Sequence, residues 1–341
     1  MKPVVVVALS GGVDSAVSAY LLKKQGYKVL ALYMKNWEDC PEEEYQDVMQ
    51  ICKHLAIDYY TLNFTKEYQE EVFSHFLREY KMGRTPNPDI LCNREIKFKV
   101  LLDKALQLGD FLATGHYARI DSSHNLLRGL DETKDQSYFL YTLKKSQLEK
   151  VMFPLGDLKK ATVREIAKEI NLPVHAKKDS TGICFIGERK FKEFLSNYIG
   201  FTQGDFANLK GEKLGTHDGM AFYTIGQRKG IKLGGKGDAW YVVGKDPKRN
   251  VVYIEQGKDH PSLFSSSLLA TEVTWVNEEP TSPQCTAKIR YRTEDAPCIL
   301  TKQDEGTYRV DFLTPQRAIT EGQSVVFYQG EVTLGGGVIA F

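Results

Sequence analysis

The sequence predicts an α/β protein with a β-rich C-terminal half: a doubly wound, mostly parallel sheet, then a small β-rich central domain and a C-terminal antiparallel β-barrel. Three observations support this fold class. An apolar run at Val4–Leu9 leads through a glycine-rich turn into a helical pattern. Strand and helix patterns then alternate as far as Thr114, and from about Gly200 helical periodicity gives way to short segments between glycines. We expect domains at residues 1–199, 200–262 and 263–341.

The glycine-rich turn reads Ser10-Gly11-Gly12-Val13-Asp14-Ser15. Its glycines let the backbone approach an oxyanion closely, and its serines add donors at the positive end of the helix dipole. It has neither the lysine of G-x-x-x-x-G-K-[ST] nor the spacing of G-x-G-x-x-G. The turn instead resembles the pyrophosphate loop (PP-loop) of the N-type ATP pyrophosphatases, which implies their Rossmann-like fold. The alternative is an ordinary strand-to-helix turn rich in small residues.

The elements after the loop follow an alternating order. Val13, Val17 and Leu21 form one apolar stripe, which predicts a helix ending near Gly26. Strand patterns follow at residues 28–34, 58–63 and 111–114, with helices over about 42–55 and 66–82. Because the carboxyl ends of parallel strands meet at one edge, and ligands bind there, we expect the loop, Met34 and Gly115 at one site.

Two loops interrupt this alternation, and each carries one cysteine. Prolines in GRTPNPDILC at 83–92 stiffen the chain and predict that a helix begins near Cys92. Such a helix end, with Arg94 and Lys97 nearby, would favour a reactive thiolate. The second loop, KKDSTGIC at 177–184, follows a helix for which Thr162-x-x-Glu165 predicts a capping box. Its Cys184 lies near the flexible Gly182, which suits a thiol that must move.

The C-terminal part is predicted to be entirely β. Segments at 221–225, 240–243 and 251–254 suggest a small β-rich domain, and 257–261 is rich in turn residues. Alternating patterns at 268–276, 285–291, 298–301, 307–312, 324–328 and 337–341 predict six strands of an antiparallel barrel or sandwich.

Composition excludes several classes of protein. A net charge of +1 gives no global attraction to nucleic acid, so RNA binding would depend on local basic groups. The six cysteines contain no C-x-x-C pair, which argues against a disulfide scaffold and a four-thiolate zinc site. The apolar runs are too short to cross a bilayer and no leader pattern precedes them, so we expect a cytoplasmic protein without a membrane contact.

Strings spread over nearly the whole chain resemble the bacterial tRNA-specific 2-thiouridylases. They are SGGVDS at 10–15, MKNW at 34–37, GRTPNPDILCN at 83–93, ATGHY at 113–117, KDQSYFLY at 134–141, KDSTGICFIGERKF at 178–191, GQRKG at 226–230 and GEVTLGGG at 330–337. The resemblance implies ATP-dependent adenylation of the C2 oxygen of the wobble uridine in tRNAs for Lys, Glu and Gln, followed by sulfur transfer.

The resemblance also implies catalytic roles for particular residues. Cys184 would carry a persulfide from a sulfur-relay protein and attack the activated C2 atom. Cys92 would then attack the persulfide sulfur, which leaves a Cys92–Cys184 disulfide and 2-thiouridine, and a reductant would close the cycle. Asp89 would act as the acid or base beside a flipped-out uridine.

Further site residues, the cofactors ATP and Mg²⁺, and a monomeric state are implied in the same way. The nucleotide-binding residues would be Ala8, Leu9, Ser10, Gly11, Gly12, Val13, Asp14, Ser15, Met34 and Gly115. The residues facing tRNA and the target base would be Asn87, Pro88, Asp89, His116, Lys134, Asp135, Gln136, Arg290, Tyr291 and Gln323.

The residues by themselves leave other functions open. A PP-loop ligase or amidotransferase that adenylates a small carboxylate would use the same loop, with structural cysteines. A non-catalytic RNA-binding protein with a structural nucleotide would leave the loop and the cysteine pair unexplained. His116 fits a core position as well as a site, Asp89 fits a helix cap, and the pattern allows Asp89, Cys92 and Cys184 to hold a metal or cluster.

Overall fold

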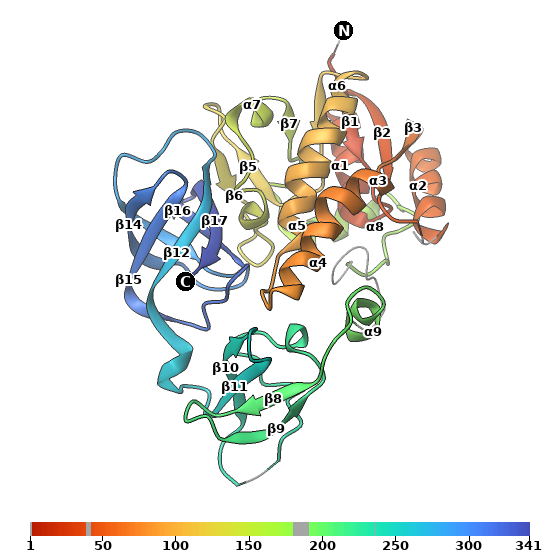
Figure 1. Cartoon of the computed structure of the whole chain (residues 1–341). Coiled ribbons are helices and arrows are strands. Elements are labelled where there is room, and N and C mark those ends of the chain that lie inside the picture. The colour runs from red at the N-terminus through yellow and green to blue at the C-terminus, as the bar shows by residue number, and fades with distance from the viewer. Residues whose placement is uncertain (1, 39–41, 180–190, 235) are drawn as a thin grey trace.

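The computed structural model of the protein describes residues 2–38, 42–179, 191–234 and 236–341. These residues form three β-sheets, coloured from red and yellow through green to blue in Figure 1. The first sheet has the strand order β3-β2-β1-β4-β7, and all of its pairings are parallel. Its strands are β1 Val4–Ala8, β2 Lys28–Lys35, β3 Asp58–Asn63, β4 Phe111–Ala113 and β7 Val151–Met152. The predicted doubly wound parallel sheet is confirmed.

Helices cover both faces of the parallel sheet. Helices α1 (Val13–Lys24), α2 (Glu42–Leu55) and α8 (Lys160–Glu169) share a core with Val5 and Val7, whereas Val6 packs on the other face with the helical segments of residues 65–106. Alternate side chains of β1 therefore enter opposite cores. This burial on both faces explains why the strand is an uninterrupted apolar run.

Two helical segments on the second face contain wide, π-helical turns. The first comprises α3 Thr65–Glu67, η1 Tyr68–Phe73 and α4 Ser74–Lys81, and so follows the helix predicted over 66–82. The second comprises α5 Pro88–Leu91, η2 Cys92–Leu101 and α6 Leu102–Leu106. Such turns often occur at functional sites, and the second segment carries Asp89 and Cys92.

Two predicted helix starts are wrong. The second segment begins at Pro88 rather than near Cys92, because proline is tolerated at the first helical position and Asn87 caps the end by accepting from the Asp89 N–H at 3.2 Å. Cys92 thus lies one turn inside the helix. Helix α8 begins at Lys160, so Thr162 lies within its first turn and forms no capping box.

Shorter elements connect the parallel sheet with the rest of the chain. They are β5 Ala118–Ile120, β6 Leu126–Arg128, η3 Ser137–Phe139, α7 Lys145–Leu148 and α9 Phe191–Ser196. The β5–β6 hairpin joins the C-terminal sheet, because Leu127 of β6 pairs with Val332. The sequence pattern did not predict this hairpin.

The central sheet has the order β10-β11-β8-β9 and packs around Phe206, Val242, Val252 and Ile254. Its strands are β8 Gly204–Ala207, β9 Lys213–His217, β10 Trp240–Asp246 and β11 Val251–Gln256, with single turns η4 Met220–Phe222 and η5 Pro261–Leu263 nearby.

The C-terminal strands close into an antiparallel barrel, as predicted. Their order is β12-β15-β14-β13-β16-β17, and β17 pairs back onto β12. They are β12 Phe264–Trp275, β13 Gln284–Lys288, β14 Ala296–Asp304, β15 Thr307–Arg317, β16 Ser324–Gln329 and β17 Val332–Ala340. Among the helices that the structure describes, none is long and apolar enough to cross a membrane.

Candidate active site

The glycine-rich loop connects β1 to α1 at the carboxyl edge of the parallel sheet. Gly11 has a φ of +73°, and a Cβ there would lie 2.8 Å from the backbone oxygen of Glu44, so that only glycine fits. The Ser15 hydroxyl donates to the Gly12 carbonyl at 3.1 Å and accepts from the Ser10 N–H at 3.2 Å. These bonds fold the loop compactly ahead of the positive end of α1.

The structure brings Gly115 against this loop. A Cβ on Gly115 would lie 2.9 Å from the Ser15 nitrogen, so the chain after β4 packs directly on the loop backbone. Met34 lies near the end of β2, the strand beside β1, and is partly buried. The expected neighbours of a nucleotide thus come from three adjacent strands of one sheet.

Asp14 in the loop has two partners on other elements. The Tyr117 hydroxyl donates to it at 2.8 Å, and Lys160 Nζ, at the start of α8, lies 2.7 Å and 2.8 Å from its two carboxylate oxygens. Burial, and then the charge of Asp14, raises the pKa of Tyr117 and keeps it a donor. Asp14 therefore fixes α8 beside the loop.

Lys160 also pairs with Asp179, the last described residue before the gap at 180–190. Its Nζ lies 2.8 Å from a carboxylate oxygen of Asp179. The same carboxylate pairs with Arg164 at 2.5 Å and with Lys134 at 2.9 Å. Burial opposes ionisation of Asp179, but the hydrogen bonds from Lys160 and Lys134 and the charges around it outweigh burial and hold its pKa well below the usual range. Cys184, the predicted persulfide carrier, lies outside the described residues.

A further lysine contacts the loop at Gly11. Lys177 Nζ is 2.6 Å from Asp47 of α2 and 3.3 Å from the Gly11 carbonyl oxygen. We call Lys134, Lys160, Arg164 and Lys177 the basic cluster. Of these, only Lys134 was expected from the sequence as a site residue, as one that faces tRNA. A phosphate-binding loop that contains no lysine needs cations from other elements, and this requirement is the signal in the sequence that could have pointed to the other three residues.

Asp89 and His116 have environments that shift their proton affinities in opposite directions. Burial raises the pKa of Asp89, and the charge of Lys97 partly offsets that shift. Burial, and then Lys97, lowers the pKa of His116, whose Nδ1 lies 2.7 Å from the Thr114 hydroxyl. The raised pKa moves the Asp89 carboxyl toward the range useful for proton transfer, whereas the lowered pKa keeps the His116 imidazole neutral.

Cys92 lies in the first turn of η2 and is 5% exposed. The next residue, Asn93, donates from Nδ2 to the Phe139 carbonyl at 3.0 Å, which fixes this turn against η3. Arg94 pairs with Glu95 at 2.7 Å, and Lys99 pairs with the same carboxylate at 2.6 Å. Glu95 therefore neutralises Arg94, one of the two cations that were expected to favour the Cys92 thiolate.

The segment Gly83–Asn87, which leads into Asp89, contacts both other sheets. We call it the junction segment. The Thr85 N–H donates to the Glu321 carbonyl at 3.0 Å, and Gln323 Nε2 donates to the Thr85 carbonyl at 2.7 Å. From the central sheet, Lys245 Nζ donates to the Gly83 carbonyl at 2.8 Å. Figure 1 shows α4 ending where the barrel and the central sheet come together.

Most residues expected to face tRNA have partners within the chain. Asp135 is buried and accepts from Gly129 and Ser137, and the Gln136 side chain accepts from the Tyr117 N–H at 2.9 Å. Arg290 donates to the Ile225 and Ala318 carbonyls and to the Thr320 hydroxyl at 2.7–2.9 Å. The Tyr291 hydroxyl donates to the Lys134 carbonyl at 3.3 Å. The contacts of Arg290 and Tyr291 connect the β13–β14 loop of the barrel to Ile225, before β10, and to Lys134, before η3.

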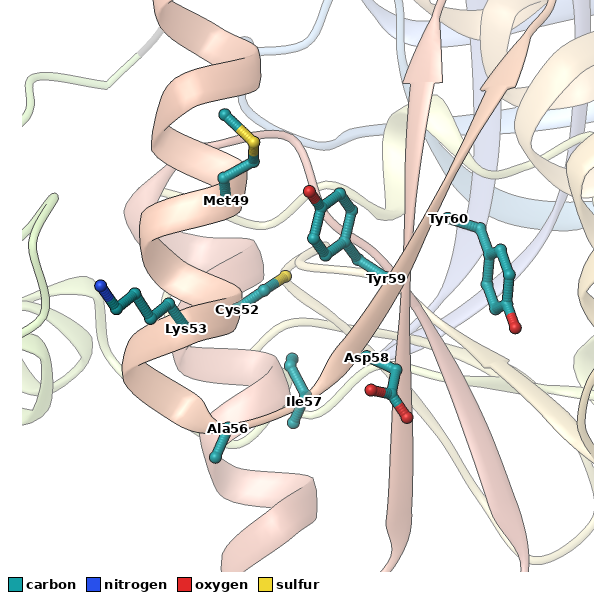
Figure 2. Close-up of a pocket in the computed structure, with 8 residues that line it drawn as sticks. All are labelled: Met49, Cys52, Lys53, Ala56, Ile57, Asp58, Tyr59 and Tyr60. Carbon is teal, nitrogen blue, oxygen red and sulfur yellow. The ribbon is translucent and has the colours of Figure 1, made fainter.

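A pocket of about 760 Å³ lies elsewhere, between α2 and β3. Figure 2 shows Tyr59 directed toward Met49 and Cys52 of α2, with Tyr60 on the other side of the strand. Asp58 in its lining begins β3, so the pocket lies toward the amino ends of the strands, opposite the loop. Burial raises the pKa of Cys52 to about 11, which makes it a poor nucleophile.

Known proteins resemble this chain along nearly its whole length. Family models match residues 3–188 (tRNA methyl transferase HUP domain), 192–256 (tRNA methyl transferase PRC-barrel domain) and 265–339 (aminomethyltransferase beta-barrel domain). A relative from Staphylococcus carnosus (strain TM300), named tRNA-specific 2-thiouridylase MnmA, is 54% identical over 98% of this chain and 94% of its own length. A relative of the same name from Protochlamydia amoebophila (strain UWE25) is 53% identical over 98% of this chain and 93% of its own.

Proposed function

Because the chain belongs to the tRNA-specific 2-thiouridylase family, we propose that it uses ATP to activate the C2 position of a tRNA uridine and replaces the C2 oxygen with sulfur. The observation that carries this proposal is 54% identity over 98% of the chain to a relative of that name. We further propose the wobble uridine of tRNAs for Lys, Glu and Gln as the target, and a monomer as the working form.

The loop geometry supports ATP as the activating substrate. Gly11 and Gly115 let neighbouring chain pack closely around the loop backbone, and the basic cluster supplies charge for a polyphosphate. Mg²⁺ prefers carboxylates and substrate phosphates, so we propose Asp14 as its protein ligand when nucleotide is bound. Adenylation converts the C2 oxygen into part of a good leaving group.

The sulfur chemistry rests on two cysteines. We propose that a sulfur-relay protein supplies Cys184 with a persulfide, which attacks the activated C2 atom as AMP leaves. Cys92 then attacks Sγ of Cys184, which breaks the S–S bond, leaves the outer sulfur on C2 as 2-thiouridine and forms a Cys92–Cys184 disulfide for an external reductant to reopen. Asp89, whose pKa is raised by burial, is placed in this proposal as the proton carrier.

We propose that the chain consists of three domains, residues 1–199, 200–262 and 263–341, which bind tRNA together. The target base would lie between Asp89 and His116 of the first domain. The tRNA-binding surfaces would be held in position relative to the glycine-rich loop by four residues: Lys134, Arg290, Tyr291 and Gln323. A small-carboxylate ligase would need neither the barrel nor the junction segment, and the relatives' names do not favour it.

Thiolation of tRNA in vitro tests the proposal. The full chain is incubated with unmodified tRNA-Glu transcript, ATP, Mg²⁺ and a persulfide-loaded sulfurtransferase, and the nucleosides are identified by mass spectrometry. We expect 2-thiouridine with the native chain and none with Cys92→Ser. Cys52→Ser is the matched control, since Cys52 is also buried but lines the pocket away from the loop.

Two results would contradict the proposal. In a parallel reaction with S-adenosylmethionine as methyl donor, a methylated nucleoside in place of 2-thiouridine would assign the chain to methyl transfer, the activity named in the family-model descriptions. Full thiolation by Cys92→Ser would exclude the role of that cysteine while leaving the overall activity intact.

A further inference from the structure

Two cysteines of the barrel, remote in sequence from the proposed catalytic pair, lie in contact. Cys285 of β13 and Cys298 of β14 are directly opposite one another in an antiparallel pairing, and their Sγ atoms are 3.6 Å apart. Opposite residues of an antiparallel pair have Cα separations within the range that a disulfide spans. The backbone pairing therefore permits a bond between these two thiols.

The two thiols differ in access, as an attacking and a resolving thiol should. Cys298 is 2% exposed and faces the barrel core, whereas Cys285 lies at the start of β13 and is only partly buried. The hydrogen bond with Cys285, and then burial, raises the pKa of Cys298. A reagent from solvent therefore reaches Cys285 first, and Cys298 lies behind it.

The pair also lies at the base of a hairpin with contacts to other parts of the chain. The loop between β13 and β14 carries Arg290 and Tyr291. Arg290 donates to the Ile225 carbonyl beside the central sheet, and Tyr291 donates to the carbonyl of Lys134, a member of the basic cluster. A covalent link between Cys285 and Cys298 would fix the root of this hairpin.

We propose that Cys285 and Cys298 are a redox modification site, which low-molecular-weight disulfides of the glutathione class convert into a cross-strand disulfide. The Cys285 thiolate attacks the reagent disulfide, forms a mixed disulfide and releases one reagent thiolate. The Cys298 thiolate then attacks Sγ of Cys285 and releases the second. Both protons go to the released thiolates, so that two protein thiols are oxidised while one reagent disulfide is reduced to two thiols.

This site is independent of the thiolation chemistry. Its formation needs neither ATP nor tRNA, and its oxidant is the reagent disulfide. All cysteines in the part of the chain that the structure describes are free thiols, and an adjacent pair among them is the arrangement that reversible redox control requires.

Thiol trapping in the full chain tests the proposal. In a Cys92→Ser/Cys184→Ser background, which removes the proposed catalytic pair, the folded protein is equilibrated at increasing ratios of oxidised to reduced glutathione and then alkylated. Trypsin cuts after Lys288 and Arg292, so Cys285 and Cys298 fall on separate peptides. We expect a linked peptide pair, the loss of two alkylatable thiols, and their return with dithiothreitol.

Matched variants identify the geometry as the cause. Cys285→Ser should lose the linked pair, and so should Cys285→Ser/Thr286→Cys, because the thiol then points to the other face of β13. Cys52→Ser should keep the linked pair. The proposal is overturned if all thiols of the folded background protein remain alkylatable at every ratio, or if glutathione stays on Cys285 without a link to Cys298. Circular dichroism confirms that each variant is folded.

Discussion

Replacing Lys160 with methionine tests whether the basic cluster is built for phosphate. Methionine keeps a long apolar side chain and removes the charge that lies between Asp14 and Asp179, 2.7 Å and 2.8 Å away. Both carboxylates keep other partners, since Tyr117 donates to Asp14 and Arg164 pairs with Asp179. The substitution therefore removes one charge without leaving either carboxylate isolated.

The burial of the ion pairs sets the size of the effect on stability. The Lys160 side chain is 12% exposed, but each carboxylate side chain is 33% exposed, so solvent screens the pairs in part. Breaking a fully buried pair costs about 3–5 kcal/mol and a surface pair about 0–1 kcal/mol. We expect a loss of about 1–3 kcal/mol, which lowers the melting temperature of the N-terminal part by several degrees.

The effect on activity should be larger than the effect on stability. Removing one preorganised charge or donor from a reacting phosphate site typically costs on the order of 10²–10³ in kcat. The assay is the initial rate of ATP-dependent tRNA thiolation at a temperature where circular dichroism shows the variant folded. Lys159→Met is the matched control, because Lys159 is exposed and next to Lys160 in sequence. A Lys160→Met rate within about two-fold of the native rate would refute the reasoning, because it falls far below that expected loss.

Three further predictions use other contacts of the site. Gly115→Ala should reduce ATP-dependent thiolation at least about ten-fold, because its Cβ would lie 2.9 Å from the Ser15 nitrogen and displace the loop. A native rate would show that the loop accommodates the methyl group without loss of activity. Asp179 has a lowered pKa, so its stabilisation is present above about pH 4 and is lost as the pH falls below that value; Asp179→Asn should remove this part of the acid dependence of the melting temperature. Burial lowers the pKa of Lys245 from 10.5 to about 8. Between these pH values the unfolded chain holds the Lys245 proton and the folded chain does not, so the free energy of unfolding should increase as the pH rises from about 8 to 10.5. Lys245→Met should lack that gain, and an unchanged pH profile would contradict the assignment.

The sequence was most informative where local chemistry determines the structure. The strand–glycine–helix order of the loop and the period-2 pattern of the barrel depend on neighbouring residues, and the structure confirms both. The predicted helix start near Cys92 was wrong because Pro88 has two allowed roles, a helix breaker or the first residue of a helix. Only Asn87, acting as the cap, distinguishes them.

Long-range contacts were beyond the reach of sequence patterns. Lys160 meets Asp14 across 146 positions, and Gln323 meets Thr85 across 238. The periodicity of apolar residues cannot predict such pairs, because they depend on how distant parts of the chain pack together. The same holds for the β5–β6 hairpin, whose strands are too short to give a pattern and which joins the barrel through one pair at Leu127.

The junction segment explains how binding to the barrel can influence chemistry in the parallel sheet. Thr85 is bonded to the barrel in both directions, by its N–H to Glu321 and by its carbonyl to Gln323, and Gly83 is bonded to Lys245 of the central sheet. Proline residues on both sides of Asn87 stiffen the few positions between these bonds and Asp89. Because these bonds and the stiff segment connect the barrel to Asp89, we expect a displacement of the barrel to move Asp89. We expect Gln323→Ala to lower the thiolation rate more than the affinity for tRNA; an equal loss of both would assign Gln323 to binding alone.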